Sequence, residues 1–409
     1  MGSNPTFGST IQPSGYPARV IAQPTRARAG FVTLFAAVGA LFPFIPVYYS
    51  SLGISLDGIG LLGALSAASA AIGSPLWGAA ADRFGSSRAV LPIAALGATA
   101  AATAVALVDP VIPLVIAVAA LGFCMAGVAP ILDARALEAA VGDRHRYGQL
   151  RVWGSASFIL GVLVVGWLID QTEIRVMFVV LVGSLLATVI VGAGFRGQTL
   201  VAETAPRLAG LASVLRSPRL GRFLLALLLV WSSSMAINAF FSIHLLDIGA
   251  DESVVGAAWA IGALVEIPLM LGYPWLGARI GLQRLMLAGA AMFLLRGVAV
   301  VILRDPLLVT ATMALHGVGF ALVLVGGVVY VSRLAPPGTA ATAQGVLGAT
   351  VFGLSAILGP GLGGALARAF GLEGMFAIAA VSSAVALIAL AWALRRDSSA
   401  TSLAELASG

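Results

Sequence analysis

The chain of 409 residues is 60% hydrophobic and only 10% charged, with a formal net charge of +6. A soluble domain carries roughly 25% charged residues, so this composition excludes an ordinary water-soluble protein. The basic balance does not indicate nucleic acid, because no basic run alternates with aromatic residues as a nucleic-acid groove requires. We therefore expect a membrane protein without a nucleic-acid partner.

Side chains that carry reaction chemistry are few. Cys124 is the only cysteine, which excludes an intrachain disulfide and a cysteine-cluster metal site. The three histidines (His145, His244 and His316) are far apart, and the sequence has no phosphate-binding glycine loop or nucleophile elbow. We expect neither an enzyme nor a metal or other cofactor.

Apolar segments of membrane length follow one another along the chain. A hydrocarbon core about 30 Å thick needs about 20 apolar residues per helix, and strand-like alternation is weak. The predicted fold is an all-α membrane protein with twelve transmembrane helices. The expected spans are 29–50, 57–80, 87–108, 112–138, 147–169, 173–195, 219–246, 253–278, 284–303, 306–333, 341–368 and 372–394.

The arginines predict the orientation of these spans. All 23 basic residues are arginine, and 17 of them lie on one side when the N-terminus is placed in the cytoplasm. The remainder are Arg175, Arg304 and Arg368 outside, and Arg135, Arg151 and Arg296 within spans. This positive-inside bias predicts that both termini lie in the cytoplasm. We expect the protein in the cell (inner) membrane.

Polar stretches divide the chain into five parts. We expect a mobile cytoplasmic tail at 1–28, a six-helix half at 29–195 and a central cytoplasmic loop at 196–218. A second six-helix half at 219–394 and a cytoplasmic tail at 395–409 follow.

An internal repeat relates the two halves. The hairpin Gly78–Arg88 and the later segment Gly277–Arg284 share the pattern R-[FI]-G-x-x-R, each between two apolar runs. The fifth and eleventh spans are both rich in glycine, and Pro360 is expected to bend the eleventh, as Pro43 and Pro46 bend the first. Parallel halves of this kind are typical of secondary transporters.

On these residues the chain resembles the major facilitator superfamily over essentially its whole length. The Gly78–Arg88 hairpin is similar to the superfamily's loop between spans two and three, with serines replacing some usual basic residues. Further segments resemble the branch of oligosaccharide, nucleoside and phenylpropionate proton symporters. They are Asp133, Tyr147–Gly154, Val265–Ile267, Leu295–Arg296 and Leu315–Gly317.

The resemblance implies a substrate site at Asp133 and Arg151. Both residues lie near the loop between spans four and five, so antiparallel helices bring them to similar depth and an ion pair is expected. Lactose-permease-like members bind substrate with an acid and an arginine at these positions. Asp133 then accepts hydrogen bonds from the substrate, and Arg151 orients it with a planar fork of donors. A structural clamp is the alternative.

A second group of charges is expected to couple transport to protons. Glu266, Arg296 and His316 lie near the middle of spans eight, nine and ten, and the resemblance gives them this role, with Asp133 as a further candidate. The coupling ion is expected to be H⁺. A static buried pair with a hydrogen-bonded histidine is the alternative.

Departures from the branch bear on the substrate. Lactose-type members have an acid where this chain has Gly319 and a stacking tryptophan where it has Phe158, so a galactoside is not expected. Phe158, together with Trp153, Tyr48 and Tyr49, is a candidate for an apolar wall. Asn238 is a candidate substrate contact, with interhelical hydrogen bonding as the alternative.

The first hairpin is the candidate gate. The resemblance implies that Asp82, Arg83, Gly85 and Arg88 tether helices of the two halves when the cytoplasmic side is closed. Solvated loop charges are the alternative.

Together these residues predict alternating-access, proton-coupled symport of a small organic solute, by a monomer in contact with membrane lipid. Proton-driven efflux of amphipathic compounds or lipids is the nearest alternative. A receptor or scaffold without transport is another, but such a protein has little use for buried charges.

Overall fold

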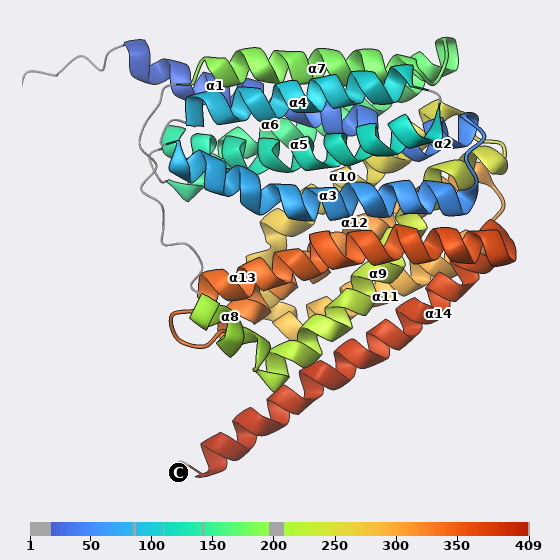
Figure 1. Ribbon diagram of the computed structural model, residues 1–409. Coiled ribbons are helices and arrows are strands. Elements are labelled where there is room, and N and C mark those ends of the chain that lie inside the picture. The colour runs from blue at the N-terminus through green and yellow to red at the C-terminus, as the bar shows by residue number, and fades with distance from the viewer. Residues whose placement is uncertain (1–17, 85–86, 109, 141–142, 196–207, 408–409) are drawn as a thin grey trace, which may run out of the picture.

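The computed structural model describes residues 18–84, 87–108, 110–140, 143–195 and 208–407, and within these ranges the chain is helical without strands (Figure 1). The helices are α1 (Ala18–Leu41), α2 (Ile45–Ser51), α3 (Leu56–Arg83), α4 (Ser87–Leu107), α5 (Val111–Ala139), α6 (Arg144–Gln171), α7 (Val176–Ala193), α8 (Leu208–Leu215), α9 (Pro218–Asp247), α10 (Glu252–Ile280), α11 (Leu282–Ile302), α12 (Pro306–Leu334), α13 (Ala340–Gly348), the π-helical turn η1 (Ala349–Leu354) and α14 (Ser355–Ala407).

The predicted tails and loop differ in part from these elements. Residues 1–17, 196–207 and 408–409, which belong to them, lie outside the described residues. Helix α1 begins inside the predicted tail 1–28, α8 lies in the predicted loop 196–218, and α14 continues past 394.

Local signals in the sequence set several helix starts. Asp305 Oδ1 accepts hydrogen bonds from the backbone N–H groups of Leu307 (2.9 Å) and Leu308 (3.0 Å), and Pro306 occupies the first turn of α12. This carboxylate satisfies N–H groups that have no partner within the helix, and proline has no N–H to satisfy. The short connection before α12 therefore follows from a few local residues.

The described chain makes twelve membrane crossings, as predicted. Eleven helical segments are long and apolar enough to cross a membrane, and the last of them spans 56 residues, Ala340–Arg395. A continuous helix of that length would extend about 84 Å, far more than a hydrocarbon core. Gly371, with φ of 72°, interrupts it with a backbone conformation that favours glycine and separates the eleventh span from the twelfth.

Two spans are irregular. The first is broken between Leu41 and Ile45, beside Pro43, so the expected bend is present. In the eleventh span the irregular turn is η1, one to two turns before Pro360, and α14 remains helical through Pro360. The bend expected at Pro360 stays a prediction, and the π-helical turn is an irregularity of a kind often found at functional sites.

The spans form two halves, α1–α7 and α9–α14. The first occupies the upper part of Figure 1, and α9, α11 and α14 occupy the lower part. Across the boundary α3 packs on α14 and α6 packs on α10. Figure 1 shows the start of α1 and the end of α14 at the same end of the bundle, here called the termini side.

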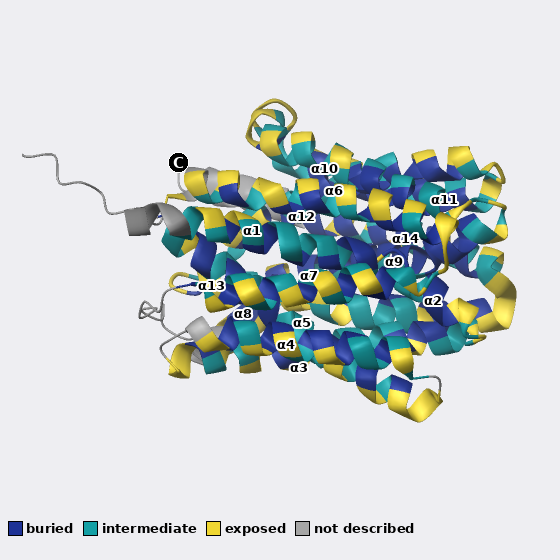
Figure 2. Cartoon of the chain, turned by 90° about the horizontal axis from the view of Figure 1, so that it is seen from above, coloured by how far each residue is buried: buried dark blue, intermediate teal, exposed yellow. Residues whose placement is uncertain are grey.

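The buried cores show that the halves meet away from the termini side. There, one core cluster draws on both halves and includes Val162 of α6 and Val255 of α10. On the termini side one cluster, which includes Phe31, lies wholly in the first half, and another, which includes Phe223, lies wholly in the second. Figure 2 shows exposed positions along the outer flanks of the bundle.

Glycines make this asymmetric contact possible. A Cβ atom on Gly60 of α3 would lie 2.3 Å from the Pro360 carbonyl oxygen, and one on Gly256 of α10 would lie 2.3 Å from that of Val162. These helices therefore touch backbone to backbone on the side opposite the termini. Termini-side glycines of the same spans have nothing within 4 Å of an added Cβ; they are Gly78, Gly148, Gly272, Gly277, Gly345 and Gly348.

Polar contacts also join the halves on the opposite side. Arg368 of α14 forms an ion pair of 2.7 Å with Asp57 of α3. The backbone N–H of Ser253 in α10 donates to the Asp170 carboxylate of α6 at 3.2 Å, and the Ser253 hydroxyl donates to it as well. The described structure is therefore closed opposite the termini and open toward them.

Candidate functional site

A cavity of about 430 Å³ lies between the two halves. Its wall comes from α1, α2, α3 and α5 of the first half and from α9, η1 and α14 of the second. The wall is mainly apolar and includes Phe42, Phe352, Met125 and Met235. A cavity of this size holds a small organic molecule, and flexible methionines adapt to molecules of different shape.

Polar side chains at this wall are sparse. Among the lining residues that the structure describes, Tyr49, Ser66 and Asn238 carry side-chain hydrogen-bonding groups. Tyr49 was expected at an apolar wall and lies there, whereas the neighbouring Tyr48 is buried and donates its hydroxyl to the Val105 carbonyl oxygen at 3.1 Å. Few polar groups can fix the orientation of a ligand without making the cavity hydrophilic.

Asn238 connects the cavity to a buried cation. Its Oδ1 accepts a hydrogen bond of 2.7 Å from Arg296, which is only 1% exposed. The same guanidinium lies 3.5 Å from His316 Nδ1, 3.2 Å from Met313 Sδ and 4.8 Å from the ring centroid of Phe241. No carboxylate in the described part of the chain pairs with Arg296, so positive charge is held beside the cavity.

Glu266 stands apart from this cluster. We expected an acid–arginine–histidine group, and the structure brings together the arginine and the histidine only. Glu266 is half-buried in α10 and makes no hydrogen bond or ion pair with any residue that the structure describes. An ionised carboxylate within a span costs at least about 2.5–3.5 kcal/mol, so an unpaired acid here is expensive unless it has a function.

Asp133 and Arg151 each have a different partner, so the expected ion pair between them is absent from the described structure. Asp133 Oδ1 accepts a hydrogen bond of 2.9 Å from the Tyr147 hydroxyl. The Arg151 guanidinium lies over Phe35, 4.0 Å from the ring centroid, and 5.4 Å from that of Phe31. A hydrogen bond and a cation–π contact thus replace the ion pair. Neither charge lines the cavity in this open state.

The remaining predicted residues lie elsewhere. Phe158 is half-buried and packs against the core shared by both halves, not at the cavity wall. Asp82 and Arg83 are exposed on the termini side at the end of α3, where the halves are apart. Gly85 and the side chain of Arg88 lie outside the described residues. Their assignments to substrate binding and gating remain predictions.

The sequence did not predict most of the residues that line the cavity. Phe42, Met125, Met235 and Phe352 are apolar residues within apolar spans, so their sequence signal is the same as that of lipid-facing or packing positions. Ser66 is a small polar residue of a kind common in helix contacts. Only the assembly of the two halves distinguishes these residues from their neighbours.

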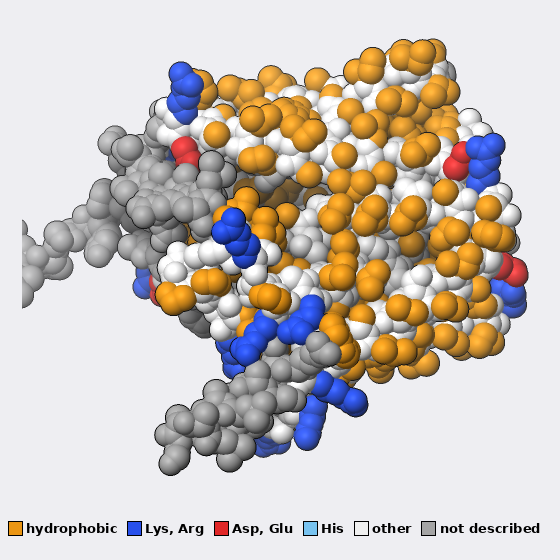
Figure 3. All heavy atoms as spheres, turned by 60° about the horizontal axis from the view of Figure 1, so that its bottom comes forward, with side chains coloured by type: hydrophobic (Ala, Val, Ile, Leu, Met, Phe, Trp, Pro, Cys, Tyr) orange, Lys and Arg blue, Asp and Glu red, His pale blue; other side chains and the backbone are white. Residues whose placement is uncertain are grey.

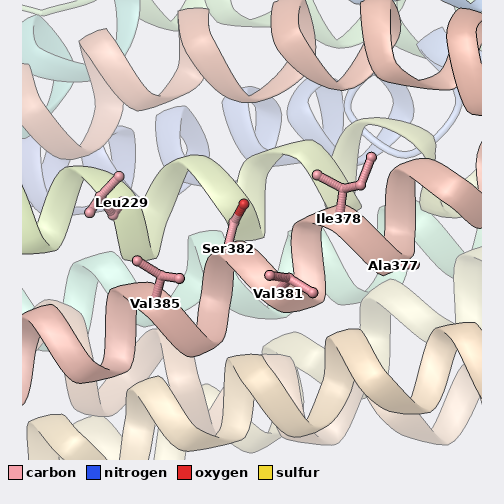
Figure 4. A pocket seen from close by; sticks show the side chains of 6 residues that line it. All are labelled: Leu229, Ala377, Ile378, Val381, Ser382 and Val385. Carbon is pink, nitrogen blue, oxygen red and sulfur yellow. The ribbon is translucent and has the colours of Figure 1, made fainter.

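A second groove lies on the outside of the bundle. It is lined by Leu229 of α9 and by residues of α14 that include Val381 and Val385, and Figure 4 shows their apolar side chains. Val381 and Val385 are 65% and 54% exposed. Exposed apolar side chains within spans face lipid, so this groove belongs to the lipid-facing flank.

Comparisons with known proteins agree with this architecture. The model of the MFS_1 like family matches residues 27–378. The maltose permease of Geobacillus stearothermophilus is 27% identical over 373 residues, which cover 90% of this chain and 94% of that protein. The probable 3-phenylpropionic acid transporter of Escherichia coli (strain K12) is 26% identical over 254 residues, 61% of this chain and 66% of that protein.

A solved structure shares the fold. The nucleoside transporter NupG superposes with a TM-score of 0.81 at 18% identity, covering 91% of this chain and 99% of that chain. At this identity the likeness concerns the arrangement of helices, not the ligand.

Proposed function

The chain belongs to the MFS_1 like family, and on that basis we propose that it moves a small organic solute across the cell membrane by alternating access, driven by protons. The observation that carries the proposal is the cavity between the halves, open toward the termini and sealed opposite them by Gly60, Gly256 and the Asp57–Arg368 pair. Rocking the halves about this cavity would expose it to each side in turn.

The distribution of arginines supports an orientation with both termini in the cytoplasm. The open side of the cavity then faces the cytoplasm. Glu266 is the proposed proton-binding group, because it is an unpaired carboxylate, among the described residues, in a span that otherwise excludes charge. Proton binding at this position would be linked to the conformation that exposes it, which is the basis of symport.

The cavity wall favours an amphipathic solute with one polar or acidic end. A sugar presents many hydroxyl groups, each of which must keep a hydrogen-bond partner when it leaves water. Tyr49, Ser66 and Asn238 can satisfy few of them, whereas the apolar remainder suits a hydrocarbon or aromatic body. The cation of Arg296 behind Asn238 favours a negatively charged end over a positive one.

Proton-driven efflux is the second candidate. The same apolar, methionine-containing wall would accept amphipathic compounds taken from the cytoplasm. The two candidates differ in the relative direction of solute and proton movement.

Reconstituted vesicles with an internal pH dye test the proposal. Maltose, a nucleoside, 3-phenylpropionate and a cationic dye are added in turn, with the Glu266→Gln variant as the control. We expect solute to enter together with protons, and the strongest signal from the aromatic acid. Opposite movement of solute and protons would establish efflux. If solute binds but does not cross the vesicle membrane under any gradient, the transport proposal is refuted and the protein acts as a receptor.

A further inference from the structure

A third cavity of about 390 Å³ lies on the termini side, away from the solute cavity. Its polar lining residues are Gln283 and Arg284 at the start of α11 and Tyr330 and Arg333 near the end of α12. Ile280 and Leu282 flank them. We call this the basic cavity.

The backbone fixes the shape of the basic cavity. Gly281, with φ of 92°, joins α10 to α11 as a single residue, so Arg284 is held on the first turn of α11. Tyr330 is 6% exposed and its ring lies 4.4 Å from that of Phe223, centroid to centroid. The two arginines therefore project from segments that are anchored in the second half.

The charges around the basic cavity are unbalanced. Arg284 and Arg333 are both exposed, and neither forms an ion pair with any residue that the structure describes. The termini-side ends of α9 to α12, with the residues just before α9, contain arginines and no carboxylate among the described residues; the arginines are Arg216, Arg219, Arg222, Arg279, Arg284 and Arg333. The end of α14 differs, because its sequence contains Asp397 and Glu405 as well as Arg395 and Arg396. Figure 3 shows basic side chains gathered at this end, whereas the basic groups at the far end adjoin acidic ones.

The depth of the basic cavity indicates the source of the missing anion. It lies where α10 and α12 end and α11 begins, which is the level of lipid headgroups for helices that cross a bilayer. Ile280, 42% exposed, offers apolar surface beside the arginines. A soluble anion gains nothing from contact with this apolar surface, whereas the acyl chain of a lipid would pack against it.

We propose that the basic cavity binds the phosphate group of an anionic phospholipid, with Arg284 and Arg333 as its ligands and Ile280 against the acyl chain. Two guanidinium groups supply planar donors to phosphate oxygens. Basic pockets between transmembrane helices on the cytoplasmic side are suited to such headgroups. The bound lipid would hold the α10–α11 hairpin against the end of α12.

Native mass spectrometry of the full chain tests this. Phosphatidylglycerol and the net-neutral phosphatidylethanolamine are titrated separately against the wild type and the Arg284→Gln/Arg333→Gln variant. An arginine near an anionic lipid contributes roughly fivefold in affinity, so the double variant should bind phosphatidylglycerol about thirtyfold more weakly. Arg284→Lys/Arg333→Lys should retain most of the preference, because the charges remain.

Arg279→Gln is the matched control. Arg279 is an exposed arginine of the same connection, but it lies over Trp275, 4.3 Å from the ring centroid, and does not line the basic cavity. Equal loss of phosphatidylglycerol in this variant, or no loss in the double variant, would overturn the site. A third outcome combines two results: millimolar inorganic phosphate raises the thermal stability of the protein, and the protein binds the two lipids equally well. That outcome would show a soluble-anion site and overturn the lipid assignment.

Discussion

Asn238 accepts a hydrogen bond of 2.7 Å from Arg296 and also lines the cavity between the halves. A solute that binds in the cavity therefore meets the amide, and a fully buried guanidinium lies directly behind it. In the proposed transport cycle, this hydrogen bond would couple solute binding to the charge cluster of the second half without exposing the cluster.

Replacement of Arg296 by lysine should weaken solute binding about tenfold or more. An ammonium cannot reach Asn238, His316 and Met313 as the planar guanidinium does, and a hydrogen bond to a charged group contributes about 1.5–3 kcal/mol. Calorimetric titration of the purified protein with its solute measures the change. Asn238→Ala should also lower affinity, and wild-type affinity in both variants would remove the cluster from the binding site.

The Glu266→Gln variant should exchange bound solute across vesicles but lose uphill accumulation. Glutamine keeps the size of the side chain and removes its ability to take up and release a proton, while the cavity wall is unchanged because Glu266 does not line it. Counterflow and proton-driven uptake, assayed in the same vesicles, separate the two properties. Asp133→Asn is the companion variant, and uphill transport at the wild-type rate in both would exclude these carboxylates as the coupling groups.

Gly256→Ala should shift the protein toward a state open on the side opposite the termini. The added Cβ would lie 2.3 Å from the Val162 carbonyl oxygen, so the closed contact of α10 with α6 is disfavoured. Overpacking costs about 1–3 kcal/mol, which shifts the populations about 5- to 150-fold.

Spin labels at Thr172 and Asp251, introduced after Cys124→Ala, report this distance, and it should lengthen. Gly148→Ala is the control, since nothing lies within 4 Å of its added Cβ. Equal distances in the two variants would contradict a role for Gly256 in closure.

Asp82→Asn should favour the state open toward the termini. Asp82 is exposed in the described open state, so a contact that it makes across the halves exists only when this side closes. Loss of about 1–2 kcal/mol shifts the populations about five- to thirtyfold. Label distances across the termini side, without solute, should lengthen. Asp143→Asn removes another exposed carboxylate of this side and should have no such effect; if both behave alike, Asp82 is an ordinary surface charge.

The sequence by itself determined the number of spans, the division into halves and the positions of the charges within the membrane. These properties are local: about 20 apolar residues cross a bilayer wherever they lie, and Gly371 separates two spans through its own backbone conformation.

Only the tertiary structure decided which charges are partners and which apolar residues form the cavity. Arg296 bonds Asn238, 58 positions away, and Glu266 stays apart, although the sequence placed the acid, the arginine and the histidine at similar depth. Asp133 likewise accepts a hydrogen bond from Tyr147, and Arg151 lies over the ring of Phe35, so the two charges do not pair with each other. Depth follows from position along a span, but contact depends on helix rotation and on how the halves pack, and lipid-facing and cavity-facing surfaces are both apolar.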